Sequence, residues 1–185
     1  LDRIAQLKAE NQELRLAAQS AAPPEFSLND GRSMPSVGLG TWGGGDSGEM
    51  VAGAGKIALR NGYRLIDCAE IYGNEKEVGE ALHEVFASGV SRVDLFVTSK
   101  VWNTNHAPEH VHQACKNSLK NLGLEYLDLY LVHWPLAWEH TGLKPGKNTD
   151  ASGRVKMAKV PLMDTWKAME SLVDAGLVKS IGVSN

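Results

Sequence analysis

The chain has 185 residues, 43% of them hydrophobic, and a formal net charge of -3 at pH 7. That length supports one domain with a sizeable core, and the composition argues against a disordered chain or a basic nucleic-acid-binding surface. No apolar run approaches the ~18 residues of a membrane span, and no basic stretch leads into an apolar secretion signal. We therefore expect a cytoplasmic protein that binds neither nucleic acid nor membrane.

Residues 1–24 are expected to stand apart from the rest of the chain. Positions 4, 7, 11, 14 and 18 follow the spacing of a coiled-coil seam, and residues 21–24 then read Ala-Ala-Pro-Pro. About two to three heptads are fewer than a secure coiled coil needs. We interpret residues 1–24 as a short helical, weakly coiled-coil-like extension and linker, with self-association through this helix as an alternative.

The compact part begins at residue 25 with a β-hairpin. Residues 26–28 and 32–34 form short strands around Asn29-Asp30-Gly31, where the glycine supplies the left-handed turn residue. Residues 37–42 follow as a short strand, and its glycines indicate that another backbone or a ligand approaches closely.

Two phosphate-binding patterns are incomplete in this region. Residues 38–43 match G-x-G-x-x-G, but only Val37 represents the preceding strand, and residues 44–48 delay the helix. Gly55-Lys56 resembles the end of a Walker A loop, but Ile57 stands where that loop requires Ser or Thr. The first pattern remains an alternative, and the second is excluded.

Helices and strands then alternate to the end of the chain. Helices are expected at about residues 49–61, 74–89, 108–122 and 161–175, and strands at about 63–67, 94–99, 126–132 and 179–183. Asn74 is expected to cap the second helix. The last helix is expected to bury Leu162, Trp166, Met169 and Val173. This alternation predicts an α/β fold with a parallel sheet.

Three ionisable side chains arrive at the same end of successive strands. Asp67 and Lys100 are 33 residues apart, and Lys100 and His133 are again 33 apart, which is about the length of one strand-helix-strand unit. Right-handed crossovers place such strands side by side, so these groups can converge with Tyr72, which follows Asp67 in a loop. Each residue alone has an ordinary structural explanation, but three in equivalent positions indicate one site.

This set of groups suits the reduction of a carbonyl. A phenol, with a pKa of about 10, is a poor acid at neutral pH, but a neighbouring ammonium stabilises its anion. Lys100 can do this for Tyr72, while Asp67 holds Lys100 in place. His133 can then donate to the carbonyl oxygen. No Ser or Cys lies in a nucleophile elbow, so an external nucleophile is needed, and hydride from a nicotinamide is the candidate.

A metal site is not expected. His106 and His110 form an i, i+4 pair next to His112, but Pro108 marks a helix start and places all three on a solvated N-terminal turn.

From about Phe26 to Asn185 the chain resembles the aldo-keto reductases, most closely their aldose-reductase-like members. The resemblance rests on GLGTW (38–42), GYRLIDCAEIYGNEKEVG (62–79), SKVWN (99–103), LYLVHWP (129–135) and DTWKAMESLVDAGLVKSIGVSN (164–185). It implies a (β/α)8 TIM barrel of aldo-keto reductase type, with residues 25–185 as a partial barrel that stops after the fifth strand.

The resemblance also implies an NADPH-dependent oxidoreductase that reduces aldehydes or ketones to alcohols, with Tyr72 as general acid. The implied catalytic tetrad is Asp67, Tyr72, Lys100 and His133. The implied contacts to NADP(H) are Gly40, Thr41, Asp67, Ser184 and Asn185. Trp42, Trp102 and Trp134 would line an apolar pocket for the small-molecule carbonyl substrate.

Five strands are fewer than the eight of a closed barrel. A piece of this size would leave two strand edges unpaired and the barrel interior open. We therefore expect the 185-residue chain alone to be unstable or to associate, and to have little or no reductase activity. A non-catalytic cofactor-binding or regulatory subunit on the same fold is the alternative function.

Overall fold

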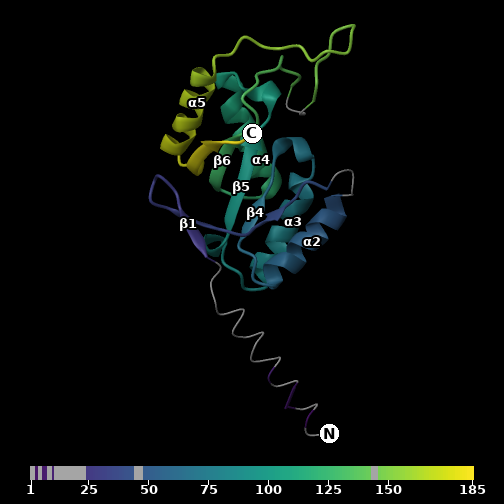
Figure 1. Cartoon of the computed structure of the whole chain (residues 1–185), viewed down its shortest axis with the longest axis vertical. Coiled ribbons are helices and arrows are strands. Elements are labelled where there is room, and N and C mark those ends of the chain that lie inside the picture. Colours follow the sequence, from purple (N-terminus) through teal and green to yellow (C-terminus); the bar gives the residue numbers. More distant parts are fainter. Residues whose placement is uncertain (1–2, 4–5, 8–9, 11–23, 44–47, 143–145) are drawn as a thin grey trace.

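A five-stranded parallel sheet forms the centre of the computed structural model, which describes residues 3, 6, 7, 10, 24–43, 48–142 and 146–185 (Figure 1). The strand order is β3-β4-β5-β6-β7, with every neighbouring pair parallel. The strands are β3 (Leu39–Gly40), β4 (Leu65–Asp67), β5 (Phe96–Val101), β6 (Leu127–Val132) and β7 (Val178–Val183). The predicted α/β fold with a parallel sheet is therefore confirmed, and among the described residues this sheet is open, with β3 and β7 at its edges.

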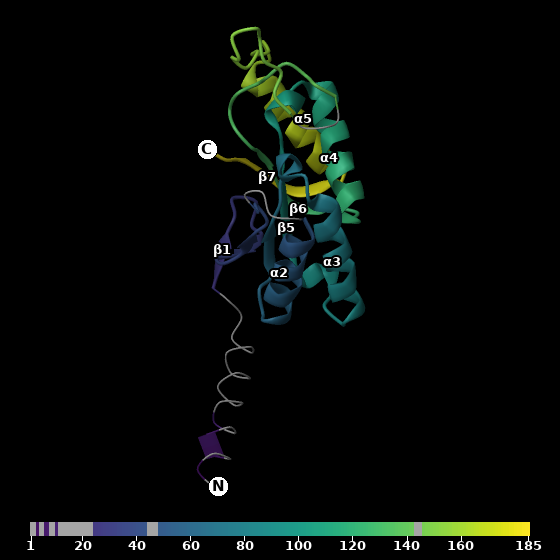
Figure 2. The ribbon, with the colours of Figure 1, turned by 90° about the vertical axis from the view of Figure 1, so that its right-hand side faces the viewer.

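Four helices connect successive strands and cover one face of the sheet, as the side view shows (Figure 2). They are α2 (Gly48–Arg60), α3 (Glu75–Ala87), α4 (Pro108–Leu122) and α5 (Leu162–Asp174). Three single-turn 3-10 helices lie between them: η1 (Glu70–Tyr72), η2 (Arg92–Asp94) and η3 (Asn103–Asn105). No helix in the described ranges has the length and apolarity that crossing a membrane requires.

The predicted hairpin forms at residues 25–35 and lies on the side of the sheet opposite the helices (Figure 2). Strand β1 (Glu25–Ser27) pairs antiparallel with β2 (Ser33–Pro35), and Gly31 between them has φ +84°. The turn contacts the sheet because the hydroxyl of Ser180 in β7 donates to the Asp30 carboxylate. The predicted extension at residues 1–24 lies almost entirely outside the described residues.

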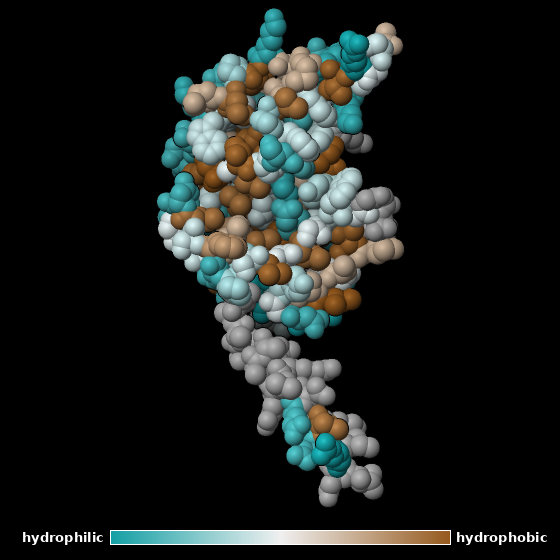
Figure 3. Space-filling model, in the orientation of Figure 1, coloured by the Kyte–Doolittle hydropathy of each residue, from teal (hydrophilic) through white to brown (hydrophobic). Residues whose placement is uncertain are grey.

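The two faces of the sheet differ in how completely they are covered. Ile66, Val97, Tyr130 and Val132 point toward the helices, and each is at most 1% exposed. On the other face, Leu65, Leu129 and Leu131 are only partly buried. Hydrophobic side chains accordingly gather over the middle of this face in the space-filling view (Figure 3). A parallel sheet is normally buried on both faces, so the open face is where further structure would pack.

The ends of α4 follow the expected signals. Pro108 occupies the first turn, where a missing N–H costs no hydrogen bond, and Gly123 closes the helix in the left-handed conformation with φ 65°.

The expected side-chain cap of α3 by Asn74 is wrong, although Asn74 does precede the helix. Its side chain makes no capping hydrogen bond. The amide instead donates to the carbonyl oxygen of Thr41 at 2.7 Å. This buried hydrogen bond connects the start of α3 to the residue after β3. The Asn74 side chain is therefore used for a tertiary contact and not for capping the helix.

The buried face expected for α5 is also partly wrong. Thr165, Ala168, Met169 and Leu172 are buried, whereas Leu162 and Val173 are 43% and 36% exposed. The hydroxyl of Thr165 donates to the carbonyl oxygen of His106 at 2.9 Å. Because α5 packs against the segment that contains His106, Thr165 faces inward, and Leu162 and Val173 remain on the surface.

We expect Gly79→Ala to destabilise the fold by about 1–3 kcal/mol, because a core that is already close-packed cannot accept an added methyl group. A Cβ at Gly79 would lie 2.5 Å from the carbonyl oxygen of Asn121 and 2.8 Å from the Leu122 backbone of the packed helix α4. Gly53→Ala is the matched control: no atom lies within 4 Å of its added Cβ, and this partly exposed helical site should gain up to about 1 kcal/mol. Urea unfolding followed by circular dichroism measures both changes, and equal effects would contradict the packing argument.

Candidate active site

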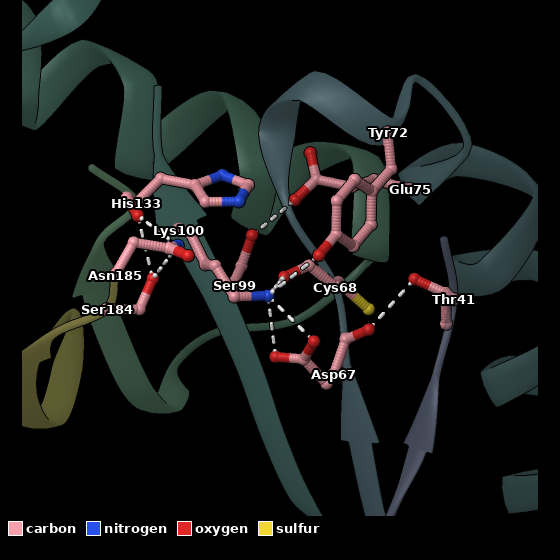
Figure 4. A network of polar contacts seen from close by, with 10 residues as sticks. All are labelled: Thr41, Asp67, Cys68, Tyr72, Glu75, Ser99, Lys100, His133, Ser184 and Asn185. Atoms are coloured by element: carbon pink, nitrogen blue, oxygen red, sulfur yellow. Dashed lines mark hydrogen bonds and ion pairs between the residues drawn. The ribbon is translucent and has the colours of Figure 1, made fainter. Parts of the chain in front are cut away.

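The ammonium of Lys100 is the centre of a polar network at the carboxyl ends of the strands (Figure 4). It donates to both carboxylate oxygens of Asp67 at 2.7 Å, to the carbonyl oxygen of Cys68 at 2.8 Å and to the hydroxyl of Tyr72 at 3.2 Å. Lys100 is only 6% exposed. A buried ammonium requires a close anion and further acceptors, and all of them come from β4 and the turn after it.

The chain brings these groups together through the ends of two neighbouring strands. Asp67 is the last residue of β4 and pairs in register with Thr98, two residues before Lys100 in β5. The single turn of η1 then returns the chain so that Tyr72 faces Lys100, and Gly73 ends this turn with φ 68°. A glycine at this position allows the left-handed backbone that the reversal needs.

His133 follows β6 and completes the set. Its ring lies 5.8 Å from that of Tyr72 and 5.2 Å from that of Trp102, both edge-on. Burial, with a smaller contribution from the Lys100 charge, lowers the pKa of His133 to about 4. The ring is therefore neutral at physiological pH, with one N–H donor and one acceptor nitrogen.

The residues predicted to contact a cofactor lie around this network. Thr41 is buried and donates from both its backbone N–H and its hydroxyl to the carbonyl oxygen of Asp67. Ser184 and Asn185 both donate to the carbonyl oxygen of His133, at 2.8 and 2.9 Å. Gly40 is exposed at the end of β3. The carboxyl ends of the two edge strands are thus fastened to Asp67 and His133.

The three tryptophans predicted for a substrate pocket differ in their surroundings. Trp42 lies 5.3 Å from the Tyr72 ring but is 64% exposed, whereas Trp102 is 8% exposed against His133. Trp134 is 41% exposed, and none of the ring contacts among the described residues involves it. The sequence-based prediction missed Trp138, whose ring lies 5.2 Å from that of Trp102.

Two buried carboxylates next to the site were also missed. Glu70 and Glu75 are 4% and 3% exposed, and burial raises the pKa of each. Glu75 accepts a hydrogen bond from Ser99 at 2.7 Å, directly behind Lys100 (Figure 4). The sequence signal was present, because both belong to the segment that carries Tyr72, but charged residues in a loop and a first helical turn are normally solvated.

The expectation that three histidines lie on a solvated turn is wrong. His106 is 2% exposed, His110 stacks on His140 at 3.6 Å, and the His112 ring is hydrogen-bonded to Ser171. Helix α5 and the loop after β6 pack over this turn and cover it. Within the described ranges, no group of three or more His, Cys, Asp or Glu side chains is placed to hold a metal ion.

We expect the folded His133 ring to titrate near pH 4 rather than at its usual value of about 6.5. Lys100→Met should raise this pKa, because it removes a nearby positive charge, whereas Lys56→Met, which removes a surface pair with Glu84, should not. Histidine-selective proton–nitrogen NMR measures the titration. A midpoint near 6.5 in the folded chain would contradict the burial argument.

The same shift has a consequence for stability. The unfolded ring binds a proton below pH ~6.5 and the folded ring only below about 4. The fold therefore loses stability as the pH falls between these values, and His106, whose pKa burial also lowers to about 4, acts in the same direction.

Comparison with known proteins gives relatives over most of the chain. Residues 36–185 match the family model described as "Aldo/keto reductase family". Aldose reductase B of Dictyostelium discoideum is 51% identical over 165 residues, which are 86% of this chain and 53% of that protein. Aldo-keto reductase family 1 member A1 of Rattus norvegicus is 52% identical, covering 85% of this chain and 48% of its own. NAD(P)H-dependent D-xylose reductase of Pachysolen tannophilus is 46% identical, with coverage of 86% and 51%.

Solved structures give the same result. The aldose reductase from Schistosoma japonicum matches with a TM-score of 0.81 and 52% identity over 86% of this chain and 52% of that one. The aldose reductase from Giardia lamblia matches with a TM-score of 0.76 and 50% identity, with coverage of 80% and 48%. The chain thus spans about half the length of the relatives it matches.

Proposed function

The chain belongs to the aldo/keto reductase family, and on that premise we propose that its site reduces aldehydes or ketones to alcohols with NADPH, Tyr72 acting as general acid. The observation that carries this proposal is the position of the Lys100 ammonium, which is hydrogen-bonded to both the Asp67 carboxylate and the Tyr72 hydroxyl.

The hydrogen-bond direction fits a proton donor. An ammonium has donors only, so the Tyr72 oxygen accepts from Lys100 and its own proton remains free for another acceptor. When that proton moves to a substrate oxygen, the phenolate left behind gains a full charge interaction with Lys100. Asp67 keeps the ammonium in place while this happens, so the charge is ready before the reaction begins.

His133 is suited to polarising a carbonyl without protonating it. A ring whose pKa is about 4 stays neutral at physiological pH, and its N–H can donate to the same oxygen that Tyr72 protonates. The two rings meet edge-on at 5.8 Å. Tyr72 and His133 would then share the oxygen from two sides.

The polar side chains at the rim fit a nicotinamide. Hydroxyl, amide and carboxylate groups of Ser184, Asn185 and Asp67 stand next to His133 and Lys100, and such groups suit the carboxamide of that ring. When bound, NADPH supplies the hydride that is added to the carbonyl carbon, while Tyr72 supplies the proton to the oxygen, giving an alcohol and NADP+.

The aromatic surroundings favour an apolar carbonyl compound as substrate. Trp42 lies against Tyr72, and Trp102 and Trp138 lie beyond His133. Flat apolar walls on both sides of the proton donor suit an aromatic aldehyde better than a strongly polar one.

The open sheet supports the proposal that residues 25–185 belong to a closed (β/α)8 barrel. Among the described residues, both edge strands have an unpaired side. Relatives of about twice the aligned length share this half at about 50% identity. Alone, the 185-residue chain would join other copies through these edges.

We expect the 185-residue chain alone to show little oxidation of NADPH by an aromatic aldehyde. A chain completed after Asn185 with the remaining half of the Schistosoma japonicum aldose reductase should be active. The decrease in NADPH absorbance measures turnover, and light scattering measures the association of the shorter chain. Fast turnover by the shorter chain would contradict the requirement for a closed barrel. Tight NADPH binding by the completed chain without turnover would favour a regulatory subunit.

In the completed chain, Tyr72→Phe should lower kcat by about 10²–10⁴-fold, the usual contribution of a positioned general acid. NADPH binding, followed by fluorescence quenching, should stay unchanged. Tyr63→Phe is the matched control, because it removes a phenol that is 38% exposed ahead of β4. Undiminished turnover in Tyr72→Phe would overturn the assignment of the acid.

A further inference from the structure

Glu70 is a buried carboxylate that joins two turns at the edge of the site. One oxygen accepts a hydrogen bond from the backbone N–H of Trp102 at 3.1 Å, and the other accepts from the side-chain amide of Asn105 at 2.7 Å. Glu70 begins η1, the turn that ends at Tyr72, whereas Trp102 and Asn105 flank or belong to η3. The carboxylate is therefore a cross-link between η1, which carries Tyr72, and η3, which follows Trp102.

This cross-link is costly for the protein to keep. Glu70 is 4% exposed, and among the described residues it forms no ion pair within 4.0 Å. Burial raises the pKa of Glu70, against the two donated hydrogen bonds. An apolar residue would avoid the cost of burying a carboxylate, but it would leave the Trp102 N–H and the Asn105 amide without this acceptor, so the two hydrogen bonds are what the carboxylate supplies.

Trp102 is the point through which the cross-link acts on the site. Its ring contacts His133 and Trp138, both at 5.2 Å, and its indole N–H donates to the carbonyl oxygen of Gly146 at 3.2 Å. The loop after β6 is held to the same turn, because the backbone N–H of Trp138 donates to the carbonyl oxygen of Asn103 at 2.8 Å. A shift of the Trp102 backbone would move all these contacts together.

We propose that Glu70 is a positioning residue that fixes the Trp102–Trp138 wall relative to Tyr72, and thereby sets how an aromatic carbonyl compound is held against its proton donor. The inference rests on the proposed reductase function for its catalytic consequence. Its structural part concerns only the two turns. Because Glu70 lies two residues before Tyr72 in a single-turn helix, neither turn can shift without straining these hydrogen bonds.

Two substitutions of Glu70 separate the hydrogen bonds from the bulk of the side chain. Glu70→Leu keeps a similar size but leaves the Trp102 N–H without its acceptor. Glu70→Gln keeps one acceptor for that N–H. The Asn105 side-chain oxygen is buried without a partner, and if the Asn105 amide rotates by 180°, the new Gln amide can donate to this oxygen. Gln should therefore restore the arrangement that Leu removes.

The first readout needs no turnover and uses the 185-residue chain with 5-fluorotryptophan. Its five tryptophans give separate fluorine NMR signals that Trp→Phe variants assign. Glu70→Leu should shift or broaden the Trp102 and Trp138 signals, and Glu70→Gln should leave them in place. Trp166 is the internal control, because its indole N–H donates to Glu170 within α5, and none of the ring contacts among the described residues joins it to Trp102 or Trp138.

A folded Glu70→Leu chain with unchanged Trp102 and Trp138 signals would overturn the proposal. If Glu70→Leu unfolds, the Trp166 signal moves as well, and Asn105→Ala decides instead. That variant removes only the 2.7 Å bond, so a smaller shift of the Trp102 signal supports the proposal, and no shift overturns it.

The second readout uses the completed chain. Glu70→Leu should lower kcat/KM for an aromatic aldehyde by about 10- to 100-fold, as a displacement of about 1 Å in a site can, and leave the KM for NADPH unchanged. Unchanged kcat/KM in an active completed chain would overturn the catalytic part of the proposal. If the completed chain is inactive while the fluorine signals behave as expected, the reductase function fails and the cross-link stands.

Discussion

Lys100 is only 6% exposed, and its ammonium lies 2.7 Å from both carboxylate oxygens of Asp67. Taking such a cation out of water costs several kcal/mol, and only a close anion with additional acceptors can offset that cost. The acceptors are all supplied by β4 and the turn that follows, so the charge ties two neighbouring strands and the phenol of Tyr72 into one arrangement. His133 stays neutral, because its own burial and the nearby Lys100 charge both disfavour its protonation.

Parallel topology explains why this arrangement forms at one end of the sheet. Every crossover returns through a helix on the same face, so β4, β5 and β6 all end at the same edge. The helix-covered face is packed and apolar, and polar groups gather at the strand ends. Contacts from the edges reinforce the position, since Thr41 reaches Asp67 from β3, and Ser184 and Asn185 reach His133 from β7.

The open sheet corresponds to about half of the relatives that the chain matches. A sheet with two unpaired edges and a half-covered apolar face is an incomplete packing unit. Of the four residues proposed for acid catalysis, Asp67 and Lys100 nevertheless lie in these strands, and Tyr72 and His133 follow the ends of β4 and β6. Trp42, Trp102 and Trp138 lie in the segments that follow β3, β5 and β6.

The sequence by itself determined the order of helices and strands, the parallel sheet and the residues that converge, because periodicity and equal spacing of Asp67, Lys100 and His133 depend on local chain geometry. Only the tertiary structure decided which faces are buried. It placed Thr165 inward on α5, covered His106, aimed Asn74 at Thr41 and enclosed Glu70 between two turns. These outcomes depend on partners far away in the sequence, whose distance and direction no local pattern encodes.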